Sequence, residues 1–376
     1  MKVEIVHDVV VSPNLAAGTP SVVCVYPSMT VLRDGSIVCV YRQGTAKHSR
    51  DGVFYAQRSG DGGRSWSKPV PIYDGMSSQK PECVHTGVVC ETPGGVLLAF
   101  FTTVAAVKPD AYIFGEEGRR LWQRPLVSAS TDGGHSWKAA RQLELSGLPH
   151  SAYIASRPLI LPDGGILLPI EITDTHGQET MLACVSTDEG LSFEPALPIA
   201  KDETGGLGYG DGKFDRLADG TLIMLAWTYR NPSEETIRVH RCESRDGRTW
   251  SPPQPTNVVC QIMTPLQMAG SLIIAAGNVR TPPEGIRLFH SRDCGKTWDT
   301  SAPVQLWDPR RLQITGAVLP IEAPPPDREG IWGALPSFTF GSPELAKLGE
   351  DEALMTYYAI IEGITHVRAC RFRIIA

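Results

Sequence analysis

The sequence predicts an all-β protein built from repeated antiparallel units, and three observations support this prediction. Helix-like patterns are nearly absent, and the 37 glycines and 30 prolines suit many short strands joined by turns. Strand-like runs such as Val53–Arg58 are each followed by one pattern, Ser-x-Asp-x-Gly-x-Ser/Thr-aromatic. The pattern occurs at Ser59–Trp66, Ser130–Trp137, Ser186–Phe193 and Ser291–Trp298, and one residue short at Ser244–Trp250.

The chemistry of the pattern explains its spacing. Ser and Asp side chains accept hydrogen bonds from the backbone N–H groups of a tight turn, and Gly supplies the positive φ that the reversal requires. The aromatic residue then begins the next apolar strand. The pattern is therefore a hairpin device, and we assign its Asp residues a structural rather than a catalytic role.

Repeated patterns of this form are the Asp-boxes of the sialidase (neuraminidase) superfamily, which the chain resembles. The resemblance covers nearly the whole sequence and implies a six-bladed β-propeller. Because a repeat architecture is one unit whatever its length, we expect residues 1–376 to form a single sialidase-like propeller domain. Function must still be argued from the site, because one scaffold carries many activities.

Six repeated units can be followed along the chain. Five of them contain two strands joined by an Asp-Gly or similar turn, a loop, and a third strand that enters a box. The sixth lacks a box and is expected at Leu335–Phe340, Glu352–Ile360 and Thr365–Ile374, with one helical turn at Pro343–Leu348. We expect Val3–Val11 to pair near the C-terminal run Val367–Ile375 and so close the ring.

Composition excludes several classes of function. The formal charge is 35 − 41 = −6 with no basic run, so we expect no nucleic-acid partner. No apolar run approaches the roughly 20 residues that span a bilayer, and the N-terminus lacks the features of a signal peptide. Most of the nine cysteines lie singly in strand-like runs, which favours a cytoplasmic location. No zinc-type spacing occurs, so we expect neither a metal nor a cofactor.

In a propeller, the residues that enter each first strand and leave each second strand share one rim of the central channel. A polar rim on an apolar frame is typical of a binding site. The entries give Tyr26, His85, Arg157, Tyr209, Asp211 and Met263. The exits and following loops give Arg42, His48, Arg50, Asp51, Glu171, Asp174, His176, Arg230, Arg280 and Tyr357 or Tyr358. Guanidinium groups suit bidentate recognition of a carboxylate, so the arginines favour an anionic sugar.

The resemblance implies that three arginines bind the substrate carboxylate. The first belongs to an F/Y-R-I-P motif, which corresponds here to Cys24–Pro27, so Val25 stands at the arginine position. The second corresponds to Arg230 and the third to Arg280 or Arg287, and Arg157 could replace the missing one from another direction.

The resemblance also implies the catalytic groups. The general acid/base corresponds to Asp51, in the loop after the second strand of blade one, and His48 could tune or replace it. The nucleophile corresponds to Tyr357, with Tyr358 as its alternative by strand phase. Asp211 stands where the family has the Glu that activates this Tyr.

Our leading hypothesis is an exo-acting glycoside hydrolase of sialidase type that removes a terminal acidic sugar, sialic acid or a related one, from a glycoconjugate or oligosaccharide. The residues expected to bind substrate are Arg42, Arg157, Arg230, Arg280, Tyr26, His85, Glu171 and Tyr209. One alternative is a uronate-specific oligosaccharide lyase, in which His48 or His85 and a Tyr abstract the proton α to the carboxylate. The other is a propeller that binds glycan without catalysis.

Overall fold

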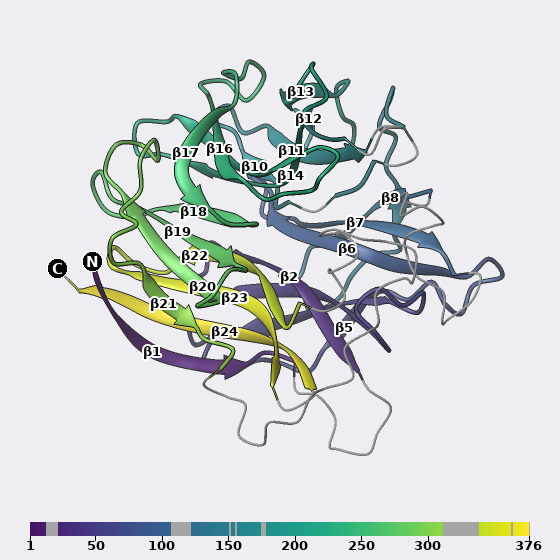
Figure 1. The fold of residues 1–376 in the computed structure, drawn as a ribbon. Helices are drawn as coiled ribbons and strands as arrows, with labels where there is room; N and C mark the ends of the chain where they lie inside the picture. Colours follow the sequence, from purple (N-terminus) through teal and green to yellow (C-terminus); the bar gives the residue numbers. More distant parts are fainter. Residues whose placement is uncertain are drawn as a thin grey trace.

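The computed structural model describes residues 1–12, 22–106, 122–149, 152–154, 156–173, 178–310, 338–361 and 364–375. Within these ranges the chain forms six antiparallel sheets of four strands each, the blades of a six-bladed propeller (Figure 1). The predicted all-β fold is therefore confirmed. Among the described residues no helix has the length and hydropathy needed to cross a bilayer.

Each blade contributes one strand to each of four layers, counted outward from the axis. The first strands are β2 (Val23–Val31), β6 (Glu82–Glu91), β10 (Leu159–Ile160), β14 (Leu207–Arg216), β18 (Met263–Gln267) and β22 (Phe340–Lys347). The second are β3 (Ile37–Gly44), β7 (Leu97–Ala105), β11 (Ile166–Thr173), β15 (Leu222–Arg230), β19 (Ile273–Val279) and β23 (Glu352–Ile361).

The two outer layers follow in the same order. The third strands are β4 (Val53–Ser59), β8 (Arg124–Ser130), β12 (Glu179–Ser186), β16 (Arg238–Ser244), β20 (Gly285–Ser291) and β24 (Ile364–Ile375). The fourth are β5 (Val70–Tyr73), β9 (Arg141–Gln142), β13 (Leu197–Ala200), β17 (Gln254–Val259), β21 (Val304–Trp307) and β1 (Lys2–Val10). Neighbouring blades meet through their first strands, as β2 does with β6 and β22.

The Asp-boxes connect the third strands to the fourth as the sequence predicts. In the box after β12, the Ser186 hydroxyl donates to Asp188 Oδ1 at 2.8 Å and accepts the Gly190 N–H at 2.8 Å. The Ser192 N–H also donates to Asp188 Oδ1, at 2.9 Å. The carboxylate thus holds the turn together, which is the structural role assigned to it.

The predicted ring closure is confirmed. Strand β1 pairs antiparallel with β24, in a register that runs from Lys2 opposite Ile375 to Val10 opposite Arg368 (Figure 1). The N-terminal strand is therefore the outermost strand of the last blade, and the pairing joins the two ends of the chain.

One expectation for the last blade is wrong. Pro343–Leu348 was expected to make a helical turn, but the residues up to Lys347 belong to strand β22. Pro343 lies in an irregularity of this strand between Gly341 and Glu344, where its missing N–H costs no ladder hydrogen bond.

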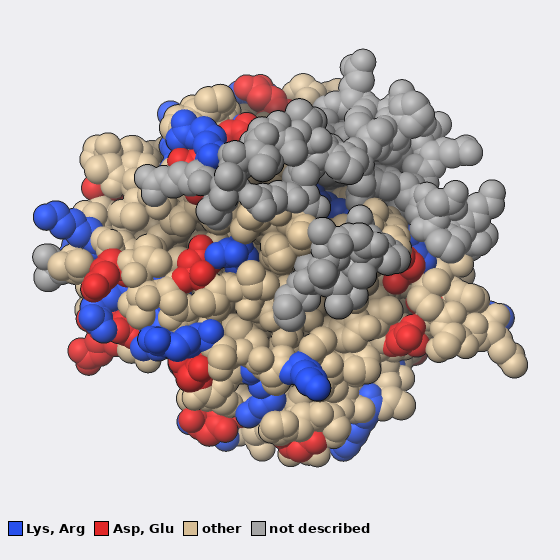
Figure 2. Space-filling view, turned by 90° about the horizontal axis from the view of Figure 1, so that it is seen from below, with Lys and Arg blue, Asp and Glu red and all other residues tan. Residues whose placement is uncertain are grey.

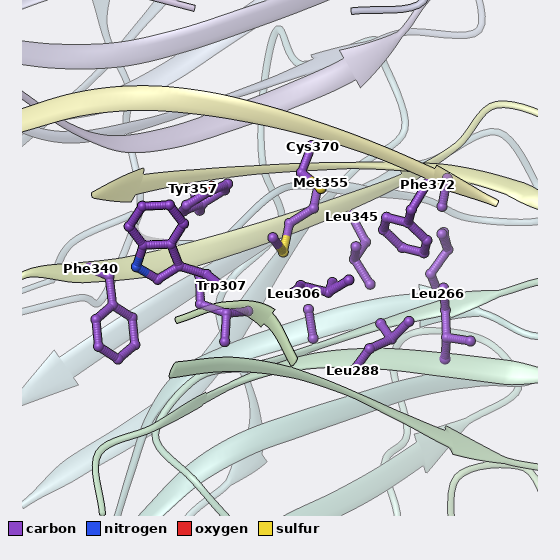
Figure 3. Close-up of a cluster of buried hydrophobic side chains, with 14 of the residues drawn as sticks. Leu266, Leu288, Leu306, Trp307, Phe340, Leu345, Met355, Tyr357, Cys370 and Phe372 are labelled. Atoms are coloured by element: carbon purple, nitrogen blue, oxygen red, sulfur yellow. The ribbon is translucent and has the colours of Figure 1, made fainter. Parts of the chain in front are cut away.

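The core consists of apolar clusters between neighbouring blades. Figure 3 shows the cluster between blades five and six, where Leu266 and Leu288 of one blade face Leu345 and Phe372 of the next. Burial of such side chains stabilises the fold by about 1.5–3 kcal/mol each. The clusters fix the blades against one another and so fix the positions of the loops at the rim.

The box carboxylates predict how stability depends on pH. Hydrogen bonds from the Ser192 side chain and backbone hold the pKa of Asp188 at about 2, below its ordinary value of 3.8. A lowered pKa in the folded state gives stability that is present above the unfolded pKa and is lost as the pH falls towards the folded pKa.

We therefore expect Asp188→Asn to lower the free energy of unfolding at neutral pH by about 1 kcal/mol. Between about pH 4 and pH 2, urea denaturation should show a shallower loss of stability for the variant than for the wild type. Parallel pH curves for the two proteins would contradict the role assigned to this carboxylate.

Candidate active site

An open pocket, about 870 Å³ when the solvent space at its mouth is included, lies where the first strands begin and the second strands end. The first strands contribute Tyr26, His85, Asp211, Lys213 and Glu344. The ends of second strands and the loops after them contribute Lys47, His48, Trp227, Arg280 and Tyr358. Residues from different blades thus meet at one rim, which is the rim that the sequence analysis searched.

Three first strands share the same irregularity at this pocket. In β2, β14 and β22 two residues oppose a single residue of the neighbouring strand. The first residue of each pair has a positive φ although it is not glycine: Tyr26 at 56°, Asp211 at 47° and Ser342 at 50°. Such bulges re-aim side chains, and strained backbone of this kind is concentrated at functional sites.

The residue after each bulge is buried in the pocket. These residues are Ser28, Lys213 and Glu344, and together we call them the pocket floor. Lys213 Nζ and Glu344 Oε1 form an ion pair at 2.8 Å, with side chains only 5% and 3% exposed. Burial alone would lower the pKa of Lys213, but the charges of Glu344 and Asp211 raise it above its ordinary value. The ammonium group is therefore charged and is balanced by a carboxylate.

A half-buried arginine forms another side of the pocket. The Arg280 guanidinium lies 4.0 Å from the ring centroid of Phe338 and 4.4 Å from that of Phe340, and its Nε donates to Gln261 Oε1 at 2.6 Å. Desolvation lowers the pKa of Arg280, while the neighbouring Tyr358 acts in the opposite direction. A guanidinium at this place stabilises negative charge on the phenol oxygen.

Aromatic and imidazole rings line a further side of the pocket. The Tyr26 hydroxyl lies 3.1 Å from His48 Nε2, and the rings of His48 and His85 have centroids 6.5 Å apart. His85 stacks on Tyr153 at 5.8 Å. Two imidazoles and two phenols from three blades thus follow one another along the wall.

Glu171 supports this wall from behind. The Tyr153 hydroxyl donates to Glu171 Oε2, and Glu171 Oε1 accepts the backbone N–H of Asp211 at 2.9 Å. The carboxylate therefore ties the aromatic wall to the bulge of β14. Glu171 itself is buried and holds two pocket residues in place.

The structure brings together six of the residues named from the sequence as site candidates: Tyr26, His48, His85, Asp211, Arg280 and Tyr358. Others lie elsewhere. Asp51 accepts the Thr45 N–H at 3.0 Å and the Ser49 hydroxyl, so it caps the loop that carries His48 and does not line the pocket.

The arginines expected to converge do not do so. Arg42 is fully buried and donates to the carbonyl oxygens of Val84 and Ala46 at 2.9 and 2.8 Å. Arg157 donates to the Met29 carbonyl oxygen at 3.3 Å, and Arg230 is exposed and pairs with Glu235 at 3.2 Å. Of the four arginines named as substrate ligands, Arg280 alone lines the pocket.

Two tyrosines also point away from the pocket. Tyr209 is buried in the apolar cluster between blades three and four, with its hydroxyl 3.3 Å from His240 Nδ1. Tyr357 lies beside Trp307 in the cluster of Figure 3 and donates to Asp8 Oδ2 at 2.8 Å. Burial, followed by the charge of Asp8, raises the pKa of Tyr357 well above its ordinary value. Of the two adjacent tyrosines, Tyr358, the alternative by strand phase, lines the pocket and Tyr357 does not.

Some predictions cannot be placed, and some pocket residues were missed. Asp174 and His176 lie outside the described residues. The sequence analysis did not name Lys47, Tyr153, Lys213 or Glu344 as site residues. The signal for Lys213 was a charged residue inside a strand-like run, which requires a partner when it is buried. Glu344 gave no such signal, because Pro343–Leu348 was expected to make a helical turn.

On the face drawn in Figure 2, basic and acidic side chains are interspersed among uncharged residues.

Comparisons with known proteins agree with the fold. A protein of unknown function from Dyadobacter fermentans is 19% identical, with a TM-score of 0.74 over 99% of each chain. The Hadza microbial sialidase Hz136 is 14% identical, with a TM-score of 0.65, over 93% of this chain and 65% of that one. A mutant of the NanB sialidase from Streptococcus pneumoniae is 11% identical, with a TM-score of 0.66, over 96% and 69%.

Identities this low show a shared fold and nothing finer. No curated protein matches the sequence. The family model described as the BNR repeat-like domain matches residues 35–261, which is well over half of the chain. The chain therefore belongs to the BNR repeat-like family and has the six-bladed propeller fold of sialidases.

Proposed function

We propose that this protein is an exo-acting glycoside hydrolase that removes a terminal acidic sugar from a glycoconjugate or oligosaccharide. The observation that carries the proposal is that Tyr358, the half-buried Arg280, Asp211 and His48 line one pocket. A nucleophile, a proton acceptor and a proton donor are the three groups that such a reaction requires.

The wall formed by Arg280 and Lys47 supports an acidic sugar as the substrate. Lys47 Nζ donates to the Phe338 carbonyl oxygen at 2.6 Å and lies 5.0 Å from the ring centroid of Tyr358. Two cationic groups thus flank the tyrosine. A substrate carboxylate near them would be attracted in a buried setting, where charge interactions are stronger than in water.

The proposed reaction uses the pocket residues in two steps. Tyr358 Oη attacks the anomeric carbon and its proton passes to Asp211, while the bond to the leaving oxygen breaks and His48 protonates that oxygen. Water then attacks the anomeric carbon and gives its proton to His48, and Tyr358 Oη leaves and regains its proton from Asp211. A phenol suits this role because a neutral nucleophile is not repelled by the substrate carboxylate.

The contact between Tyr26 and His48 favours a second candidate, a uronate-specific lyase. Here one of the two groups would take the proton α to the carboxylate, and the electron pair would form a carbon–carbon double bond as the leaving oxygen departs. The other group would protonate that oxygen. The 3.1 Å distance between the Tyr26 hydroxyl and His48 Nε2 suits such a proton relay.

We expect the purified protein to hydrolyse a fluorogenic sialoside or uronide faster than the matching neutral hexoside. Mass spectrometry of an oligosaccharide digest should show products that have gained one water. Products that have gained no water and that absorb ultraviolet light as unsaturated uronates would show that the protein is a lyase and not a hydrolase. Absence of cleavage with every acidic substrate would refute both enzymes.

Two adjacent tyrosines provide a matched pair of variants. Tyr358→Phe should lower kcat by several orders of magnitude, because it removes the nucleophile. Tyr357→Phe should keep kcat and lower the free energy of unfolding by about 1 kcal/mol, because it removes only the hydrogen bonds of the Tyr357 hydroxyl with Asp8 and Arg368. The reverse pattern of kcat values would restore Tyr357 as the nucleophile.

His48 and Asp51 provide a second comparison. His48→Gln should lower kcat/KM about 10²- to 10⁴-fold, because it removes the proton donor. Asp51→Asn should have a smaller effect, because Asp51 acts through the loop it caps. If Asp51→Asn lowered kcat/KM as much as His48→Gln does, Asp51 would be the general acid.

A further inference from the structure

The pocket floor, Ser28, Lys213 and Glu344, has no role in the reaction described above. The three residues come from blades one, four and six, and each follows the bulge of its strand. All three are less than 5% exposed. Polar groups buried in this way are normally satisfied by hydrogen bonds, so a polar floor at the bottom of a pocket requires an explanation.

Ser28 gives the clearest sign that the floor receives a ligand. Its hydroxyl is buried, lines the pocket, and has no hydrogen-bond partner in the structure. A buried hydroxyl without a partner destabilises the folded protein, and a ligand hydroxyl would supply the partner.

The charge of the floor indicates which kind of ligand group it accepts. The Lys213 ammonium and the Glu344 carboxylate are only 2.8 Å apart, so their charges nearly cancel at the distance of a bound group. A second carboxylate placed there would be repelled by Glu344 about as strongly as Lys213 attracts it. Uncharged hydroxyl groups meet no such conflict, because they can donate to Glu344 and accept from Lys213 or Ser28.

We propose that the floor binds adjacent hydroxyl groups at the non-reducing end of the terminal sugar, while Arg280 and Lys47 receive its carboxylate. This inference rests on the proposed function and adds the source of its specificity. In an internal residue, one of these hydroxyls carries the glycosidic bond to the preceding sugar. A floor that binds all of them as free hydroxyls therefore restricts the enzyme to chain ends. The spacing of the three polar groups then selects among the stereoisomers of the sugar.

The first test compares two buried serines. The wild-type protein is titrated calorimetrically with the methyl glycosides of sialic acid, glucuronic acid and galacturonic acid, and the tightest ligand is carried forward. Ser28→Ala should weaken its binding about five- to tenfold and should not lower Tm, because the substitution removes an unpaired hydroxyl. Ser156→Ala is the matched control, since Ser156 also has a buried, unpartnered hydroxyl but does not line the pocket.

A deoxy series then locates the contact. The same titrations are repeated with monodeoxy forms of the chosen glycoside. Against the form that lacks the hydroxyl bound by Ser28, the Ser28→Ala substitution should have no further effect. An equal effect of Ser28→Ala on every form would contradict a direct contact.

The ion pair is tested by replacing both partners. Lys213→Met alone would leave a buried carboxylate unpaired, so it is combined with Glu344→Gln, which removes both charges while nearly keeping the side-chain volumes. We expect this double variant to fold with a Tm close to that of the wild type and to bind the chosen glycoside at least tenfold more weakly.

The outcomes separate this inference from the proposed function. Glycoside binding that depends on the floor, without turnover of any substrate, would support the inference and refute the hydrolase. Wild-type affinity in both Ser28→Ala and the double variant would overturn the inference, whatever the turnover. Failure of the wild type to bind any of the three glycosides would overturn it as well.

Discussion

The pocket depends on a bulge that three of the first strands share. In β2, β14 and β22 an extra residue enters the strand at the same level, and a non-glycine residue takes a positive φ. Because side chains alternate along a strand, the bulge changes which residues face the axis. It places Asp211 and Lys213 in the pocket and leaves Tyr209 in the apolar cluster between blades three and four. The strain of this backbone is offset by the packed blades on either side.

The scaffold and the site place different demands on the sequence. The Asp-boxes repeat one hydrogen-bond pattern on the outer side of the blades, and the pairing of β1 with β24 closes the ring. The pocket, in contrast, uses different side chains from each blade. Its ion pair joins blade four to blade six, and Glu171 joins blade three to blade four. The geometry of the pocket therefore depends on closure of the whole ring.

The sequence predicted the fold well, because the boxes and turns are local signals that recur in every blade. Candidate residues in loops and at strand entries, such as His48 and His85, were also placed in the pocket. Predictions failed where a bulge or a contact distant in sequence decided the outcome. Tyr209 was misplaced by the bulge that follows it, and Arg42 was misread because its guanidinium binds carbonyl oxygens of its own and the next blade. The sequence could not show that Lys213 and Glu344, 131 residues apart, meet.

The central claim is that a divided pocket holds a terminal sugar, with a cationic wall for its carboxylate and a polar floor without net charge for its hydroxyls. A crystal structure of the protein with the tightest-binding methyl glycoside tests this claim most directly. We predict that the carboxylate lies against Arg280 and that adjacent hydroxyls lie within hydrogen-bond distance of Glu344 and Ser28. A sugar bound with its carboxylate on the floor, or bound outside this pocket, would contradict the account.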